Sequence, residues 1–103
     1  MGIIYKASFP NNKCYIGQTK FDLEKRKKEH KESSKLKELP FYKAIRKYGW
    51  DCITWEVIDE AETLEELDEK EIYWIEYYNS YGSGGYNATK GGDGHYAPVY
   101  FIT

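Results

Sequence analysis

Hydrophobic and polar residues alternate at the start of the chain with the period of two that is typical of a β-strand. Every second side chain of residues 3–8 belongs to the same face, so this segment predicts a strand. In the next segment, FPNNK, Pro10 fixes its own φ and the two asparagines tolerate left-handed backbone, which predicts a turn. Residues 13–17, KCYIG, then predict a returning strand that ends at Gly17. Together these segments predict a β-hairpin.

Residues 22–37 are rich in strong helix formers, but their only apolar members are Leu23 and Leu36. A helix this polar cannot be held by a hydrophobic face, so it must expose most of its surface to solvent or to a ligand. Leu23, Arg26 and His30 have the spacing of a single helical stripe. We therefore expect the arginine and the histidine to point toward the surface against which the leucine packs.

A second helix is predicted to have Pro40 in its first turn and to end at Gly49. Its apolar stripe consists of Phe41, Ala44, Ile45 and Tyr48. Alternation with a period of two returns over residues 53–57, which predicts a third strand with one buried face. The apolar residues on that face are Ile53, Trp55 and Val57.

Thr63 and Glu66 have the spacing of a capping box and predict the start of a long helix that extends to about Tyr78. The apolar stripe of this helix consists of Leu64, Leu67, Trp74, Ile75 and Tyr78. Glu71 projects into the middle of the stripe, and Asp68 lies at its edge. Because a carboxylate on an apolar face is costly unless it is paired, protonated or bound to a cation, Glu71 is a candidate functional residue.

Three roles remain open for Glu71: a salt bridge to Arg26 or Lys13, a ligand of a hard divalent cation, and a general base. His30 could be an ordinary surface histidine. Next to Arg26, however, it suits a phosphodiester, since a guanidinium grips a phosphate at two points and an imidazole transfers a proton.

Tyr5 and Tyr15 are expected from periodicity alone to be core residues, because tyrosine is common in strands. Length and composition fit one compact domain: 103 residues, of which 41% are apolar. No apolar run is long enough for a membrane span or a signal peptide, so we expect a cytosolic protein. Cys14 and Cys52 lack Cys-x-x-Cys spacing, and we expect two reduced, buried thiols.

The net charge of −2 conceals an uneven distribution. Residues 20–48 contain eleven Lys or Arg and five Asp or Glu, a local charge of +6, whereas residues 51–76 contain eleven acids and one lysine, a local charge of −10. Such a field can hold a polyanion on one face of the protein. The alternative is an ordinary charge-rich surface.

Six segments, in this order, resemble the GIY-YIG nuclease family: IIY, CYIG, LEKRKKEH, FYKAIRKYGWD, EKEIYWIEYYNS and GYNATKGG. The resemblance covers residues 2–94. Within the family, the chain resembles more specifically the phage and homing-endonuclease branch. The resemblance implies an α/β (α+β) domain with a small three-stranded antiparallel β-sheet flanked by helices. We expect residues 1–90 to form the nuclease domain and residues 91–103 to be a Gly-rich tail, either a linker or a truncated extension.

The resemblance also implies which residues form the active site. The catalytic residues carried over from the family are Tyr5, Tyr15, Arg26, His30 and Glu71. Glu71 would also be the metal ligand, and Gly17 and Asn87 would support the site, the glycine by close backbone approach and the asparagine by hydrogen bonding. Some homing members have a further histidine near the start of the second helix, where this chain reads Leu39-Pro40-Phe41, so that role is vacant or filled by another residue.

The implied function is a metal-dependent DNA endonuclease that hydrolyses phosphodiester bonds by in-line attack of water, with one Mg²⁺ or Mn²⁺ at Glu71. The implied products carry 5′-phosphate and 3′-hydroxyl ends. Tyr5, its proton drawn away by neighbouring positive charge, would act as the base or orient the water. The lysines expected to attract the double-stranded DNA backbone are Lys13, Lys20, Lys27 and Lys31.

We expect no membrane partner, a monomer or weak dimer, and a cytoplasmic location, in the host cytoplasm if the protein is phage-encoded. The alternative function is a module that docks on DNA or on a partner and cleaves weakly without an attached targeting domain.

Overall fold

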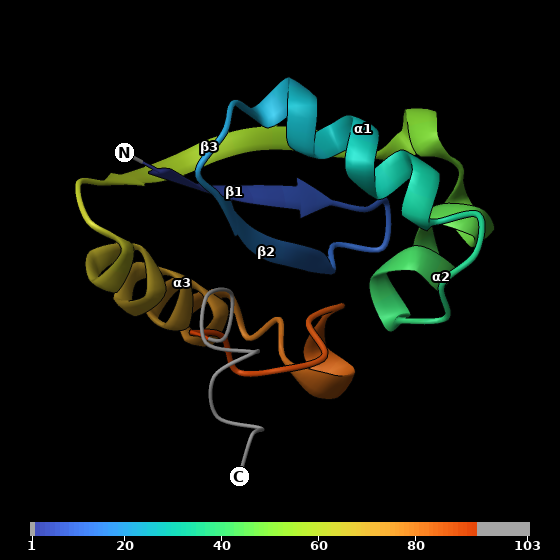
Figure 1. Cartoon of the computed structure of the whole chain (residues 1–103). Coiled ribbons are helices and arrows are strands. Elements are labelled where there is room, and N and C mark those ends of the chain that lie inside the picture. Colours follow the sequence, from blue (N-terminus) through green and yellow to red (C-terminus); the bar gives the residue numbers. More distant parts are fainter. Residues whose placement is uncertain (1, 93–103) are drawn as a thin grey trace, which may run out of the picture.

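A three-stranded antiparallel sheet in the order β2-β1-β3 organises the chain in the computed structural model, which describes residues 2–92. The strands are β1 (Gly2–Ser8), β2 (Cys14–Thr19) and β3 (Thr54–Ala61). The helices are α1 (Leu23–Ser33), α2 (Pro40–Tyr48) and α3 (Leu64–Tyr78), with short 3-10 turns η1 (Trp50–Cys52) and η2 (Gly82–Gly84). Figure 1 shows α1 and α3 on opposite sides of the sheet. This α+β architecture confirms the predicted fold class.

The hairpin forms where the alternation predicts it, and its turn uses the left-handed geometry that asparagine tolerates. Asn12 has a φ of 69°, and its N–H donates to the carbonyl of Phe9 at 3.0 Å. The prediction that β2 ends at Gly17 is wrong, because the strand continues to Thr19. Gly17 lies inside the strand, directly opposite Tyr5 of β1.

The two faces of the sheet carry two separate apolar clusters. One, toward α2, consists of Ala7, Phe9, Phe41, Tyr42, Ala44, Ile45 and Ile53. The other, toward α3, consists of Ile4, Cys14, Ile16, Ala61, Leu67 and Ile75. Helix α1 buries only one residue, His30, which is 1% exposed. The low apolar content of α1 therefore leaves a helix whose other residues are exposed or only partly buried.

Three local predictions need correction. Helix α1 ends at Ser33 rather than near residue 37, and Leu36 beyond it is 84% exposed. Val57 is 46% exposed, although its pairing opposite Tyr5 puts it on the same face of β3 as Trp55. Both cysteines are free, as expected, but only Cys14 is buried, since Cys52 lies in the exposed turn η1.

The predicted tail falls largely outside the described residues, so its part from residue 93 onward stays a prediction. Within the described chain, no helix combines the length and the apolar character needed to cross a bilayer.

Candidate active site

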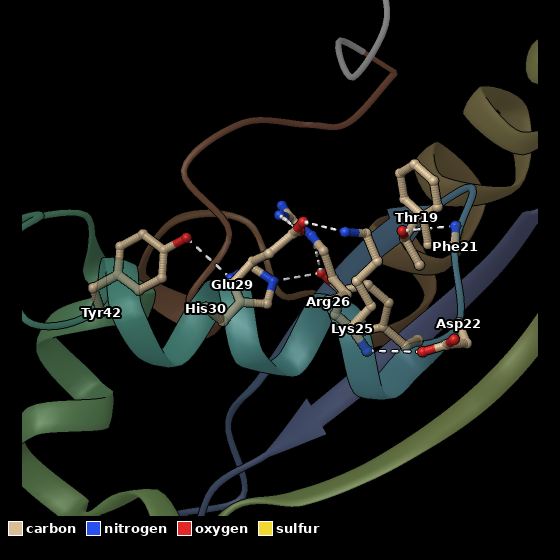
Figure 2. Close-up of polar contacts among 9 residues, drawn as sticks. Thr19, Phe21, Asp22, Lys25, Arg26, Glu29, His30 and Tyr42 are labelled. Carbon is tan, nitrogen blue, oxygen red and sulfur yellow. Dashed lines mark hydrogen bonds and ion pairs between the residues drawn. The ribbon is translucent and has the colours of Figure 1, made fainter.

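Tyr5 lies at the centre of a polar contact between the sheet and α1. Its side chain is completely buried, and its hydroxyl oxygen is 2.6 Å from Nε2 of His30. Nε of Arg26 donates to the same oxygen at 3.3 Å. Figure 2 shows Arg26 and His30 one turn apart on α1, on the same side of the helix. The stripe predicted from the spacing of these two residues therefore meets the strand at the first family tyrosine.

Gly17 provides the space in which the Tyr5 ring lies. A side chain at this position would collide with the hydroxyl end of Tyr5, and its Cβ would lie only 2.9 Å from Cε2 of Tyr15. Gly17 is needed here for its lack of a side chain, since its backbone requires no positive φ. The glycine thus lets Tyr5 extend across the edge strand β2.

Tyr15 lies beside this contact and is held by an aromatic stack. Its ring is parallel to that of Phe41 at a centroid distance of 4.0 Å, while the rings of Tyr5 and His30 are 6.2 Å and 5.6 Å away. Phe41 belongs to α2, so this helix fixes the second family tyrosine as α1 fixes the first. The core between the sheet and α3 is filled from the strands by Ile4, Cys14 and Ile16.

Arg26 has a second partner besides Tyr5. Its guanidinium Nη1 contacts Oε1 of Glu29 at 2.9 Å, and the Arg26 side chain remains 32% exposed. Burial lowers the pKa of Arg26, but the neighbouring Tyr5 and Glu29 raise it above its ordinary value, so the group stays charged. One edge of the guanidinium thus holds the site together, while part of the group remains accessible to an anion.

Glu71 is buried on α3, 8% exposed, as its place in the apolar stripe predicts. Its Oε1 accepts hydrogen bonds from Nε2 of Gln18 and from the backbone N–H of Gly92, both at 2.9 Å. Nε2 of Gln18 also donates to Oδ1 of Asp68 at 2.8 Å. Two buried carboxylates one turn apart on α3 therefore share a single amide donor from β2.

A cavity of about 180 Å³ brings Glu71 to the same space as Tyr15. The other residues that line it are Leu39, Phe41, Tyr42, Tyr86, Asn87, Ala88 and Thr89. Glu71 is close enough for its charge to raise the pKa of both Tyr5 and Tyr15. The structure thus brings all five predicted catalytic residues to one region.

Burial keeps the reactive groups neutral. It raises the pKa of Tyr5 above the ordinary value and outweighs the opposite effect of Arg26. Burial also raises the pKa of Tyr15 well above its ordinary value. The pKa of His30 is lowered to about 3 by burial, with smaller effects from the charges of Arg26 and Lys37. The expected loss of the Tyr5 proton to positive surroundings is therefore wrong for the free protein.

Asn87 supports the site by completing the outer edge of β2. Its Oδ1 accepts from the backbone N–H of Ile16 at 2.8 Å, and its Nδ2 donates to the Ile16 carbonyl at 2.8 Å. The hydroxyl of Ser80 also donates to Oδ1 at 2.7 Å. One buried side chain thereby replaces a missing neighbouring strand between Tyr15 and Gly17.

The donor set around Glu71 fits magnesium, which commonly uses one or two carboxylates together with substrate phosphates. Among residues 2–92 there is no cluster of three or more His, Cys, Asp or Glu that would form a complete protein cage. Glu71 would hold the cation, and Asp68 lies nearby through their common donor Gln18. Oxygen ligands without thiolate or imidazole favour Mg²⁺ or Mn²⁺ over zinc.

The predicted DNA-binding lysines differ in accessibility. Lys20 and Lys31 are exposed, whereas Lys13 and Lys27 are partly buried. Lys27 also lies 3.5 Å from Oε2 of Glu24 on the same helix.

Sequence reasoning missed Gln18, Asp68 and Tyr42. Tyr42 adjoins Phe41 but is not on the predicted stripe of α2, and its hydroxyl lies 3.0 Å from Nδ1 of His30. Only the vacant histidine role near the start of this helix pointed to the region.

Comparisons with known proteins identify the family of this chain. The family model of the GIY-YIG catalytic domain matches residues 1–87, so the chain belongs to the GIY-YIG family and is a nuclease catalytic domain of that class. Among solved structures it is similar to a point mutant of the catalytic domain of the intron endonuclease I-TevI, with 27% identity over 87% of this chain and 96% of that chain and a TM-score of 0.75.

A second solved structure, of the catalytic domain of the homing endonuclease I-TevI, is 26% identical over 86% of this chain and 99% of that chain, with a TM-score of 0.74. No curated protein gave a significant match.

Proposed function

We propose that this nuclease domain is a divalent-metal-dependent DNA endonuclease that hydrolyses phosphodiester bonds by in-line attack of water at a single-metal site, leaving 5′-phosphate and 3′-hydroxyl ends. The contact of Tyr5 with both His30 and Arg26 carries the proposal. It places a proton acceptor and a permanent cation on one hydroxyl, and the neighbouring Tyr15 lines a cavity together with Glu71. This combination suits a phosphodiester better than an uncharged substrate.

Because Tyr5 is neutral, it acts by relaying a proton. As the water attacks phosphorus, the Tyr5 oxygen accepts a proton from the water while its own proton passes to Nε2 of His30. The bond from phosphorus to the 3′ oxygen breaks, and that oxygen takes a proton from solvent. The negative charge of bound phosphate favours the protonated form of His30, which burial disfavours in the free protein.

The remaining groups stabilise charge. The exposed part of Arg26 neutralises charge that develops on the phosphoryl oxygens. Tyr15 donates a hydrogen bond to the phosphate or the water. A divalent cation held by Glu71, Mg²⁺ or Mn²⁺, would supply positive charge to the phosphate and the leaving oxygen.

Double-stranded DNA is the proposed partner, because α1, which carries Arg26 and His30, also exposes basic residues to solvent. The exposed lysines of α1 are Lys25, Lys28 and Lys31. Contacts of lysines with the phosphate backbone release counterions, so binding should weaken steeply as salt rises.

The test is to incubate the purified chain with supercoiled plasmid in Mg²⁺, in Mn²⁺ and in chelator. Nicking with either metal and none with chelator is expected, together with loss of nicking in Glu71→Ala. Glu76→Ala is the matched control, because Glu76 is exposed on the same helix. End-labelling of the nicked strand should find a 5′-phosphate. Equal nicking in chelator, or full activity of Glu71→Ala, would refute the role of the metal.

Tight, salt-dependent DNA binding without cleavage in either metal would instead support a docking module that needs an attached targeting domain. The same plasmid experiment, with a gel-shift assay at two salt concentrations, separates these outcomes.

A further inference from the structure

Tyr42 has no role among those that the family resemblance assigns. It lies on α2, is 7% exposed, and lines the cavity that Glu71 also lines. Its hydroxyl oxygen is 3.0 Å from Nδ1 of His30, on the opposite side of the imidazole ring from Tyr5. Figure 2 shows the hydroxyl of Tyr42, which belongs to α2, directed at the ring of His30 on α1. His30 is thus held between two phenols.

The direction of each hydrogen bond follows from counting protons. Tyr5 is neutral because burial raises its pKa, so its hydroxyl has one proton to donate. Arg26 only donates to the Tyr5 oxygen, which leaves Nε2 of His30 as the acceptor of that proton. A neutral imidazole with an unprotonated Nε2 carries its hydrogen on Nδ1.

That hydrogen on Nδ1 then requires an acceptor, and the Tyr42 oxygen is in place to accept it. A buried N–H without an acceptor is destabilising, so the Tyr42 hydroxyl favours one tautomer of His30 over the other. The favoured tautomer is the one in which Nε2 can take a proton from Tyr5.

We propose that Tyr42 is a positioning residue that fixes His30 as the Nδ1–H tautomer, so that Nε2 of His30 can accept the proton of Tyr5. The part of this proposal that concerns catalysis rests on the proposed function. The tautomer of His30 is a property of the free protein and does not depend on it. The arrangement is analogous to the orientation of a catalytic histidine by a carboxylate, with a neutral phenol in place of the charged group.

A neutral acceptor has a physical consequence for the site. A carboxylate facing Nδ1 would favour imidazolium in the free protein, whereas Tyr42 adds no charge. His30 therefore keeps its low pKa and enters the reaction unprotonated. After Nδ1–H donates to Tyr42, the Tyr42 hydrogen is available to an acceptor in the cavity.

The opposite tautomer is the rival arrangement. In it Nε2–H would donate to Tyr5 and Tyr42 would donate to Nδ1. The Tyr5 oxygen would then receive hydrogen bonds from both Arg26 and His30, and its own buried proton would need a different acceptor. Neither of the two contacts described at Tyr5, with Arg26 and with His30, would then provide an acceptor for that proton. We therefore favour the first arrangement.

Nitrogen-15 NMR of histidine-labelled protein tests the proposal without any assay of cleavage. The wild-type spectrum should show His30 with a pyrrole-type Nδ1 and a pyridine-type Nε2, and a pyridine-type Nδ1 would overturn the proposal. In Tyr42→Phe the preference should shift toward Nε2–H or to a mixture of tautomers. Tyr48→Phe is the matched control, since Tyr48 is on the same helix and its ring packs on Phe9 at 5.9 Å.

Nicking kinetics provide the second readout. Tyr42→Phe should lower kcat about 10- to 100-fold with KM nearly unchanged, as for other residues that orient a functional histidine. Unchanged kcat in a folded Tyr42→Phe protein would refute the catalytic consequence, and a shifted KM alone would indicate a substrate contact instead. If the wild-type protein has the Nδ1–H tautomer but does not cut DNA, the tautomer assignment stands and the proposed function fails.

Discussion

The hydroxyl oxygen of Tyr5 lies 2.6 Å from Nε2 of His30, and this contact joins β1 to α1 across 25 residues of sequence. Both partners are buried and neutral, since burial raises the pKa of the phenol and lowers that of the imidazole. A phenolate ready to attack a proton of water is therefore not the resting state of this site. The geometry supports a relay, in which the tyrosine gains one proton as it loses another.

Replacement of Tyr5 by phenylalanine should abolish the relay while the ring remains in place. Nicking is expected to fall by about 10²- to 10⁴-fold, the usual contribution of a general acid or base. The thermal midpoint should fall only modestly, because the packing of the ring is retained although His30 and Arg26 lose a hydrogen-bond partner. Tyr73→Phe, on an exposed tyrosine of α3, is the control. Substantial nicking by a folded Tyr5→Phe protein would show that the proton leaves the water by another route.

Stability should decrease as the pH falls through the ordinary titration range of histidine. The pKa of His30 is about 3 in the folded protein, whereas an unfolded chain titrates near its ordinary value of about 6.5. Between these values the unfolded chain binds the extra proton. The free energy of unfolding should therefore fall by as much as about 1.4 kcal/mol per pH unit, from pH 6.5 toward pH 3.

Urea unfolding at pH 7, 6 and 5 measures this slope above the range in which most carboxylates titrate. In His30→Gln the slope over these three points should become flatter. An equal slope in both proteins would mean that His30 is not the group responsible for the loss of stability.

Much of the site could be predicted because local periodicity reports burial. Alternation with a period of two made Tyr5 and Tyr15 expected core residues, and Tyr5 is indeed fully buried while Tyr15 is partly buried. The position of Glu71 in an apolar stripe predicted its burial directly. The polarity of α1 indicated that it buries little, and His30 is its one buried residue.

Other features depend on how elements pack against one another, which periodicity does not report. Gln18 contacts Asp68 and Glu71 only because α3 lies against β2. Tyr42 reaches His30 because α2 meets the end of α1. Val57 lies on the face of β3 that alternation predicts, opposite Tyr5, but it is 46% exposed, since the period of a strand does not report which part of that face a neighbouring element covers.

Gly17→Ala should damage both stability and cleavage. The added methyl group would collide with the Tyr5 hydroxyl end and crowd Tyr15, and overpacking of this kind costs about 1–3 kcal/mol. Because the displaced atom is the reactive oxygen, nicking should fall more than the unfolded fraction explains. Gly82→Ala is a useful control: its φ of +73° is strained for alanine, but no atom lies within 4 Å of the added Cβ. Equal effects on nicking in the two variants would contradict the packing argument.

Glu71→Gln should lose cleavage yet keep or gain stability. Oxygens of Glu71 and Asp68 lie within 2.9 Å of the same Gln18 nitrogen, so the two buried carboxylates lie close to each other. A glutamine side chain can still accept from Gln18 and Gly92 while one negative charge is removed. We expect the free energy of unfolding without metal to rise by up to about 1 kcal/mol. Such a gain in stability with a loss of activity is common when a functional residue is replaced.

Thermal unfolding in chelator, beside nicking in Mg²⁺, measures both properties of Glu71→Gln, with Glu76→Gln as the exposed control. The sequence leaves open whether Glu71 is a metal ligand or part of a structural ion pair. These two roles predict opposite changes in the stability of Glu71→Gln. Removal of the charge from an ion pair would leave its buried cation uncompensated and should lower stability by about 3–5 kcal/mol. A strongly destabilised variant would therefore assign Glu71 a structural role, whereas a stable, inactive one would support its role as the ligand of the cation.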